Sequence, residues 1–478
     1  MNSGEGAGSP LARLERHGAV AGREGLAALE ADWHDWGLAV STSVDRIGGA
    51  RLHPFDRLGR RVDRLEWPAG YRRLLVRGYA AGAVADAHET GSLLPGYRVG
   101  YLTSFFDPGL YCPYTVSLGT SIALAKYGDD ETRGWLTGLC RRDDGVQQGA
   151  TWMTEAGGGS DLGANVVTSA TPAGGGAWRL TGDKYFASNA DADVAVIAAR
   201  PAGAPAGVRG VALFAVPRAA PDGGANFRIR RLKDKVATRS VATGEIELEG
   251  AYGRLLGDVE TGIYTLMEVL NAARVANSIG SAALLQRALA EVEAFARERV
   301  VFGRPLIEQP LFRREFDDWQ QRLDEAFALA WAAARELDGV WRERPPYSAR
   351  FHRFRLLAHL AKYWTAEQAV AASRWAIEAH GGNGLIADHG VERLLREALV
   401  LSVWEGTPHR QMLDGLAVMR RERAHEALFE WLGEPDGCDA QRAAVEDLLG
   451  RERDAAEADL RPVFERLAAW TARVLAAQ

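Results

Sequence analysis

The sequence predicts an α+β protein in which a small β domain separates two helical regions. Apolar residues recur with helical spacing across most of residues 11–149 and again, in longer segments, across residues 263–421. Between residues 151 and 257 short segments alternate apolar and polar side chains between clusters rich in Gly, Pro and Ala. We therefore expect four parts: an N-terminal helical domain (11–150), a central β domain (151–258), a C-terminal helical domain (259–422) and an acidic helical tail (423–478).

The first two parts contain their own start and stop signals. In the helical part, residues 71–87 and 115–125 are the clearest helices, and the second is expected to end at Gly128 because glycine readily ends a helix. In the β part, residues 211–216 and 245–248 alternate as strands do. The turns between strands are predicted at the clusters 172–176, 201–210 and 219–225.

The third part is predicted to be a bundle of long helices. Apolar residues from Ile263 to Leu270 form one stripe on a helix that begins near Thr261. Pro305 and Pro310 fall where a connection between helices is expected. The tail that follows has a helical pattern, which predicts an appended helical pair.

Composition argues against several classes of function. The 478 residues carry a formal net charge of -6, which gives no overall electrostatic reason to bind nucleic acid. In the tail, acidic residues outnumber basic ones about two to one, which is unfavourable for contact with phosphates. The three cysteines, Cys112, Cys140 and Cys438, are too few and too scattered for a disulfide framework or a zinc site, so no metal is expected.

The beginning of the chain and its apolar runs bear on localisation. The first ten residues are rich in Gly and Ser and lack the basic and apolar segments of a signal peptide. No apolar run approaches the ~20 residues that cross a bilayer. We expect a cytoplasmic protein without a membrane partner.

The tripeptide Trp404-Glu405-Gly406 indicates a catalytic carboxylate. It follows a glycine run that includes Gly381 and Gly382, and it precedes Thr407. A turn at the glycine would fix the backbone of Glu405 and direct its side chain into a cavity, as a general base requires. The alternative is a glutamate on a solvated loop.

Two further segments suit a flat or anionic ligand. The stretch that begins at Met153 has three consecutive glycines between Thr154 and Ser160, so its backbone amides can come close to a ligand; the alternative is a linker between domains. In a predicted strand further along, the alternate side chains Phe186 and Ser188 offer an aromatic face and a hydroxyl donor that suit a flavin ring. The alternative is an ordinary barrel strand.

Two arginines complete the candidate set. Arg299, followed by Phe302, ends a long helix, where a guanidinium and an aromatic ring can clamp a pyrophosphate and cover an adenine. The alternative is an arginine that interacts with the helix dipole. Arg274 lies four residues after Leu270, so it places a permanent cation on the apolar face of its helix and requires a partner. Glu405 is the predicted partner.

Together these segments resemble the acyl-CoA dehydrogenase family, in order and in spacing, over roughly residues 70–422. The family's first signature, flavin-facing strand, adenine-clamp motif and catalytic signature resemble residues 153–161, 186–188, 299–303 and 381–407. A finer resemblance is to the AidB-like branch, named for an alkylation-response protein. Its grounds are residues 59–63, residues 231–235 with Arg239-Ser240, and Cys112-Pro113 ahead of Thr115.

The resemblance implies a central β-barrel, a C-terminal four-helix bundle and a homotetramer with FAD at a subunit junction. The residues that would contact the flavin and its phosphates are Met153, Thr154, Ser160, Phe186 and Ser188. Those that would reach a neighbouring subunit's FAD are Arg299 and Phe302, those along the adenine-diphosphate strip are Glu378, Gly381 and Gly382, and Thr407 follows the base.

The resemblance also implies a reaction on a small acyl substrate, with a thioester expected. Glu405 would remove a proton from the carbon next to the acyl carbonyl while hydride leaves the adjacent carbon for flavin N5. Some family members take the base from the helix that carries Arg274, but Ala272 fills that place here. Two alternatives keep the same fold: a DNA-associated flavoprotein with weak dehydrogenase activity, and a flavin-dependent monooxygenase.

Two positions depart from the family pattern. Glu378 stands where Gln is usual, and His409 stands where an amide usually meets adenine. The AidB-like branch is associated with duplex DNA through a longer, basic C-terminal region, whereas this tail is short and acidic. The strongest local signal for nucleic acid is a cluster of three arginines, which we interpret as a solvated helix face: Arg350, Arg353 and Arg355.

Overall fold

The computed structural model describes residues 8–18, 20 and 22–478. They fall into two compact units. Unit 1 joins Met1–Val20 to Arg274–Gln478, and unit 2 is Ala21–Ala273. The long helix α10 (Gly262–Glu298) passes through the boundary between them. None of the described helices is both long and apolar enough to cross a membrane.

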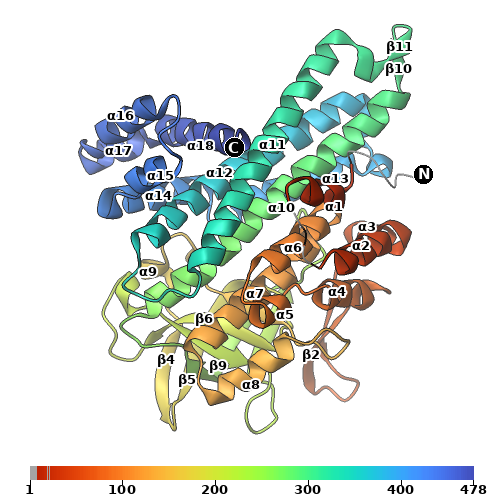
Figure 1. The fold of residues 1–478 in the computed structure, drawn as a ribbon. Coiled ribbons are helices and arrows are strands. Elements are labelled where there is room, and N and C mark those ends of the chain that lie inside the picture. The colour runs from red at the N-terminus through yellow and green to blue at the C-terminus, as the bar shows by residue number, and fades with distance from the viewer. Residues whose placement is uncertain (1–7, 19, 21) are drawn as a thin grey trace. The chain divides into compact units, whose positions relative to one another are not determined.

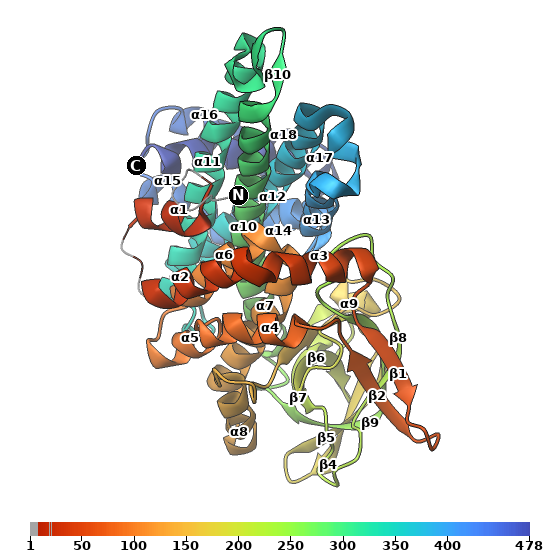
Figure 2. The ribbon, with the colours of Figure 1, turned by 90° about the vertical axis from the view of Figure 1, so that its right-hand side faces the viewer.

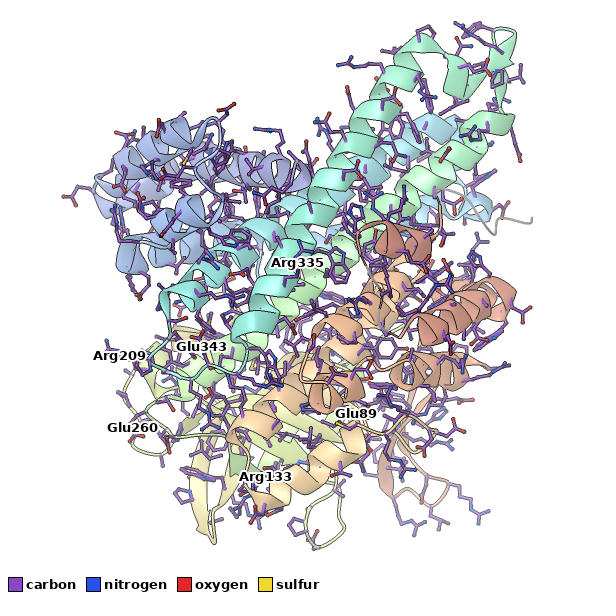
Figure 3. The ribbon with its side chains drawn as sticks, viewed as in Figure 1. Glu89, Arg133, Arg209, Glu260, Arg335 and Glu343 are labelled. Atoms are coloured by element: carbon purple, nitrogen blue, oxygen red, sulfur yellow. The ribbon has the colours of Figure 1, made fainter. Side chains whose placement is uncertain are left out.

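The first half of unit 2 is helical, as predicted. Helices α6 and α7 approach closely, because a Cβ at Gly100 would lie 2.1 Å from the ring of Tyr111, and only glycine leaves that space. Charged side chains such as Arg133 on α8 and Arg209 in η2 (Val208–Gly210) are exposed (Figure 3). The helices are α2 (Arg23–Asp32), η1 (Trp33–Gly37), α3 (Leu38–Ile47), α4 (Tyr71–Ala80), α5 (Ala85–Glu89), α6 (Leu94–Phe106), α7 (Pro108–Tyr127) and α8 (Asp130–Leu139).

A β-hairpin interrupts this helical half, and the sequence did not predict it. Strands β1 (Arg51–Phe55) and β2 (Arg61–Glu66) pair antiparallel and lie beside β8 (Figure 2). Asp63 is buried and accepts hydrogen bonds from Arg61 Nε and Ile229 N, both at 3.0 Å. The hairpin therefore depends on a partner more than 160 residues further along the chain, which local periodicity does not reveal.

The second half of unit 2 is a closed β-barrel. Strands β6, β4, β5, β9 and β7 follow one another, and β7 pairs again with β6, which closes the ring (Figure 2). Its buried core consists mostly of Ala, Val, Leu and Ile side chains, with the aromatic rings of Trp152, Phe214 and Phe227. The strands are β3 (Gly149–Trp152), β4 (Ser169–Gly174), β5 (Ala177–Ser188), β6 (Val194–Pro201), β7 (Ala212–Pro217), β8 (Arg228–Leu232) and β9 (Thr243–Leu255), and a short helix α9 (Leu162–Asn165) follows the glycine-rich loop. The predicted central barrel is confirmed.

Unit 1 is helical, which confirms the predicted C-terminal helical domain. Helix α12 (Ala349–His380) packs against α11 (Pro310–Val340), α13 (Val391–Val403) and α14 (Pro408–Glu422) (Figure 1). The remaining short elements are α1 (Pro10–Arg16), β10 (Val300–Val301), β11 (Arg304–Pro305), η3 (Leu306–Glu308), η4 (Gly381–Leu385) and η5 (Ala387–His389).

The tail consists of four helices, so the predicted helical pair is wrong. They are α15 (Ala424–Trp431), α16 (Cys438–Leu449), α17 (Arg453–Ala458) and α18 (Leu460–Ala476). The tail is also not an appendage, because α18 packs on α11 and α12 (Figure 1). The buried ring of Phe464 lies 5.6 Å from that of Tyr363, and a Cβ at Gly415 would lie 2.4 Å from it. Glycines between the helices allow the chain to reverse within few residues.

Candidate active site

Glu405 lies in the turn that joins α13 to α14 and has an unusual backbone. Its φ is 57° and that of Gly406 is 102°. A non-glycine residue in this region is strained by ~1–3 kcal/mol and persists only where its surroundings hold it. Thr407 begins the next helix as its N-cap, with its hydroxyl accepting a hydrogen bond from Arg410 N at 3.4 Å. The turn is therefore held from its C-terminal side.

Buried side chains from other helices bind the backbone of this turn. Gln411 Nε2 donates to the carbonyls of Glu405 and Gly406 at 2.9 and 3.0 Å. Lys362 Nζ, on α12, donates to the carbonyls of Ser402 and Gly406 at 2.7 and 2.8 Å. The last carbonyls of a helix have no partner within the helix, so these donors satisfy α13 and fix the turn together.

Arg274 is the third buried donor at the turn. It is 3% exposed. Its Nε donates to the Glu405 carbonyl oxygen at 3.3 Å, and its Nη2 lies 3.1 Å from Asp414 Oδ2. The structure thus gives Arg274 a carboxylate partner on α14 and a backbone contact at the turn. Its role as partner of the Glu405 carboxylate stays a prediction.

Burial and two nearby cations act in opposite directions on the pKa of Glu405. Burial raises the pKa of Glu405, while the nearby cations Arg274 and Lys362 act to lower it. Within the described part of unit 1, the Glu405 carboxylate accepts no hydrogen bond. Burial lowers the pKa of His359, hydrogen-bonded through Nδ1 to Gln411 Oε1 at 2.9 Å, to about 3, so this ring is neutral.

In unit 2 the two predicted flavin segments meet. Tyr185 N donates to the Thr154 carbonyl at 2.9 Å, and Trp152 Nε1 donates to the Ser188 carbonyl at 2.9 Å. The start of the glycine-rich loop is thereby joined to the end of β5. Phe186, on that strand, is 54% exposed. Its ring is available to a flat ligand. Met153 is buried, whereas Ser160 is exposed.

A buried ion pair anchors the same loop inside the barrel. Glu155 accepts from Lys184 Nζ at 2.5 Å, from Thr168 Oγ1 at 2.7 Å and from Val167 N at 2.9 Å. Lys184 also donates to the Ala198 carbonyl at 2.7 Å. Burial acts to raise the pKa of Glu155, but Lys184 and the hydrogen-bond donors together lower it below its usual range. Both partners of this pair sit beside predicted cofactor contacts.

The other predicted cofactor residues gather at one end of unit 1. The Phe295 and His380 rings stack at 4.3 Å, which joins the end of α10 to the end of α12. Arg299 follows α10, and Phe302, at the tip of the β10–β11 hairpin, is 100% exposed. Three exposed residues lie near His380, at the end of α12 and the start of η4: Glu378, Gly381 and Gly382.

Helix length separates that end of unit 1 from the Glu405 turn. Arg274, beside the turn, and Arg299 are 25 residues apart along α10, which at 1.5 Å per residue is about 37 Å. Likewise α13, of 13 residues, stands between η4 and Glu405, about 20 Å. The structure therefore brings these candidates together in two separate places within unit 1.

The sequence analysis did not identify four residues that surround the turn from α12 and α14: His359, Lys362, Gln411 and Asp414. One signal could have found Lys362, because it is one of only five lysines among 57 basic residues. The spacing of Gln411 and Asp414, four and seven residues after Thr407, places both on one face of the helix that follows the turn.

Comparisons with known proteins match this architecture part by part. The acyl-CoA dehydrogenase C-terminal domain matches residues 260–419, its middle domain matches residues 150–251, and the AidB N-terminal domain matches residues 5–144. The AidB protein of Escherichia coli strain K12 is 30% identical over 423 residues, which cover 84% of this chain and 76% of that protein. The chain belongs to the acyl-CoA dehydrogenase family.

Two solved structures resemble this protein over nearly its whole length. The apo-form of Bd2924 has a TM-score of 0.89 at 27% identity and covers 98% of this chain and 96% of its own. Caenorhabditis elegans ACDH-11 in complex with C11-CoA has a TM-score of 0.82 at 25% identity and covers 98% and 85%. The predicted family and its AidB-like branch are confirmed, and the chain is an oxidoreductase of the acyl-CoA dehydrogenase type.

Segments that suggested the AidB-like branch lie together in unit 2. The hairpin with residues 59–63 contacts β8, which runs into residues 231–235. Arg239 Nη1 donates to the Asp45 carbonyl at 2.7 Å, and the Ser240 carbonyl accepts from Tyr71 at 2.6 Å. These segments thus fasten the N-terminal helices to the barrel.

Most of the arginine cluster considered as a signal for nucleic acid pairs with a carboxylate of the protein itself. Glu336 binds Arg350 at 3.0 Å and also pairs with Arg353. Burial lowers the pKa of Arg355. The predicted solvated helix face is therefore not an accurate description, since these guanidinium groups interact with the protein itself. His409, a departure from the family pattern, lies 3.4 Å from Arg461 of the tail.

Proposed function

We propose that this protein is an FAD-dependent dehydrogenase that oxidises the carbon–carbon bond next to the carbonyl of an acyl thioester, with Glu405 as the base. The structure of the Glu405 turn is the observation that best supports this proposal. Glu405 is half-buried, the two buried cations Arg274 and Lys362 act on its pKa, and donors from three helices hold its strained backbone in place. A solvated loop glutamate would need none of these contacts.

Groups of this chain can remove the proton and stabilise the negative charge that then develops on the substrate. Glu405 takes the proton from the carbon next to the carbonyl, because its pKa is raised yet its ionised form is favoured by the two cations. The backbone N–H of Glu405 makes no hydrogen bond within the described part of unit 1, so it is available to the acyl carbonyl oxygen as negative charge develops there. FAD, when bound, accepts the hydride from the adjacent carbon.

Residues of unit 2 fit a flavin. The exposed Phe186 ring would lie along the flavin ring system, and Thr154 and Ser188 would supply polar contacts beside it. The loop carries few side chains that would block a ligand, since Gly157, Gly158 and Gly159 are consecutive. The Lys184–Glu155 pair keeps this loop on the barrel.

Arg299 and Phe302 support an assembly of several copies, a homotetramer by family resemblance. Arg299 is separated from Arg274, the arginine beside the Glu405 turn, by about 37 Å of helix. This distance is too long for Arg299 to contact a flavin that reacts beside the Glu405 of its own chain. A fully exposed phenylalanine beside an exposed arginine suits a second molecule's adenine and pyrophosphate. We therefore assign this end of unit 1, with Glu378, Gly381 and Gly382, to the FAD of a neighbouring subunit.

The substrate is tested by anaerobic bleaching of the flavin. The purified yellow protein is mixed with acyl-CoA thioesters of increasing chain length, including C11 because ACDH-11 binds C11-CoA, and with the matching free acids. Bleaching by thioesters alone is expected. Bleaching by free acids alone would show that the substrate is not a thioester. If dithionite reduces the flavin but no member of the panel bleaches it, the proposed reaction is contradicted.

A further inference from the structure

Lysine is rare in this protein, and its few positions are informative. Only five of the 57 basic residues are lysines: Lys126, Lys184, Lys233, Lys235 and Lys362. None of them is fully exposed. Arginine supplies the other basic side chains, and each lysine lies at a buried or half-buried position, where a compact ammonium offers three donors. Lys362 is the lysine of unit 1, and it lies beneath the proposed base.

Lys362 binds backbone carbonyls on both sides of Glu405 in the chain. Its Nζ, on a side chain whose residue is 1% exposed, donates to the carbonyl three residues before the base and to the carbonyl one residue after it. A single ammonium can bind both oxygens because its donors point in different directions. A turn whose two sides share one buried ion has little freedom to change its φ and ψ angles.

Charge at Lys362 also acts on the base. Burial lowers the pKa of Lys362 to about 7, and Glu405 is the largest charge that opposes this. In the other direction, Lys362 acts to lower the pKa of Glu405. Lys362 and Glu405 thus each favour the charged form of the other. The other charged or titratable groups near the pair, on α10, α12 and α14, are Arg274, His359, Arg355, Glu367, Arg410 and Asp414.

We propose that Lys362 is a positioning residue for the reaction, which holds the Glu405 turn from both sides and, as a cation, keeps the carboxylate ionised. This inference rests on the proposed function of Glu405. It differs from plain helix capping, in which Lys362 would only satisfy the last carbonyls of α13. Capping alone predicts a less stable protein with an unchanged pH dependence.

The first test is the pH profile of flavin reduction in Lys362→Met and Lys362→Gln. Both variants lose the charge, and Gln keeps a donor. We expect the rise of the rate with pH to move upward by about one unit or more in both, since a nearby opposite charge shifts a carboxyl by that amount. Lys126→Met, which removes a buried ammonium paired with Glu268, is the control and should leave the profile in place. An unmoved profile in active Lys362 variants overturns the proposal.

The second test does not depend on activity. Lysine labelled with 13C at Cε yields five signals, and the one missing in Lys362→Arg belongs to Lys362. We expect it to titrate near pH 7 in the otherwise unchanged protein and at lower pH in Glu405→Gln, which lacks the opposing anion. A midpoint that Glu405→Gln leaves unchanged overturns the proposal.

The two hypotheses fail in different ways. If Glu405→Gln still reduces flavin normally, the proposed base is wrong, and the inference falls with it. If Glu405→Gln is inactive but neither the rate profile nor the Lys362 signal responds as stated, only the role of Lys362 is wrong.

Discussion

Arg274 links two residues of α14 and its preceding turn: its Nη2 lies 3.1 Å from the Asp414 carboxylate, and its Nε donates to the Glu405 carbonyl at 3.3 Å. A buried guanidinium requires charge compensation, and Asp414 contributes it without occupying the base. Arg410 also pairs with Asp414. The Glu405 carboxylate thus keeps a cation nearby while remaining able to accept a proton.

Replacing Glu405 by Gln should abolish flavin reduction while flavin and fold are retained. Gln preserves the shape of the side chain but has no basicity, and loss of a general base lowers rates by about 10²–10⁴. Stopped-flow reduction by a confirmed substrate measures the rate, and the ratio of flavin to protein absorbance measures cofactor content. A near-normal rate would place the base elsewhere.

Asp414→Asn should strongly destabilise unit 1. The change leaves the Arg274 guanidinium, 4% exposed at its side chain, without its carboxylate, and breaking a buried pair in this way costs about 3–5 kcal/mol. Urea unfolding measures the loss. Asp317→Asn, in an exposed pair with Arg313, is the matched control and should change the free energy of unfolding by less than about 1 kcal/mol. Equal effects in both variants would argue against the compensation.

Arg299→Ala should weaken FAD retention and loosen the assembly. The guanidinium is proposed to neutralise a pyrophosphate held by a neighbouring subunit. Flavin content after gel filtration and the mass from analytical ultracentrifugation measure the two effects. Arg297→Ala, which breaks an exposed pair with Glu293 on the last turn of the same helix, should change neither. Unchanged flavin content and mass in Arg299→Ala would remove Arg299 from the site.

Glu155→Gln should lower thermal stability in a pH-dependent way. The pKa of Glu155 is lowered in the fold, so its ionised form contributes stability above the pKa of an unfolded glutamate, about 4.3, and that contribution is lost as pH falls through the lower folded value. The difference in melting temperature between the two proteins should therefore be largest near neutral pH and shrink in acid. A difference that grows in acid would contradict this sign.

Duplex DNA should bind no more tightly than the ~10⁻⁴–10⁻⁶ M of non-specific association at physiological salt. The physical reason is that Arg350 and Arg353 already pair with Glu336 and that the tail is acidic. Titration of a labelled duplex at two salt concentrations measures the affinity. Sub-micromolar binding that weakens steeply with salt, and disappears in Arg350→Gln with Arg353→Gln, would favour a DNA-associated role.

Local patterns in the sequence were sufficient for the order of the parts and for the candidate residues. The change from helical to alternating period near residue 150 marked the barrel, and the return near residue 260 marked the helical domain. Glu405 could be selected because an aromatic, a carboxylate and a glycine are consecutive and because further segments of the chain fit the same site. Each of these signals lies within a few residues along the chain, which is the range over which periodicity and turn chemistry act.

Only the tertiary structure decided what surrounds those residues. Lys362 reaches the Glu405 turn from α12, and the β1–β2 hairpin depends on β8, so neither contact follows from local spacing. The tail likewise packs on the helical domain because α18 buries Phe464 beside Tyr363 of α12 and Gly415 of α14. Helix-to-helix contacts depend on where whole surfaces fit together, and a one-dimensional pattern contains the apolar face of each helix but not the partner that covers it.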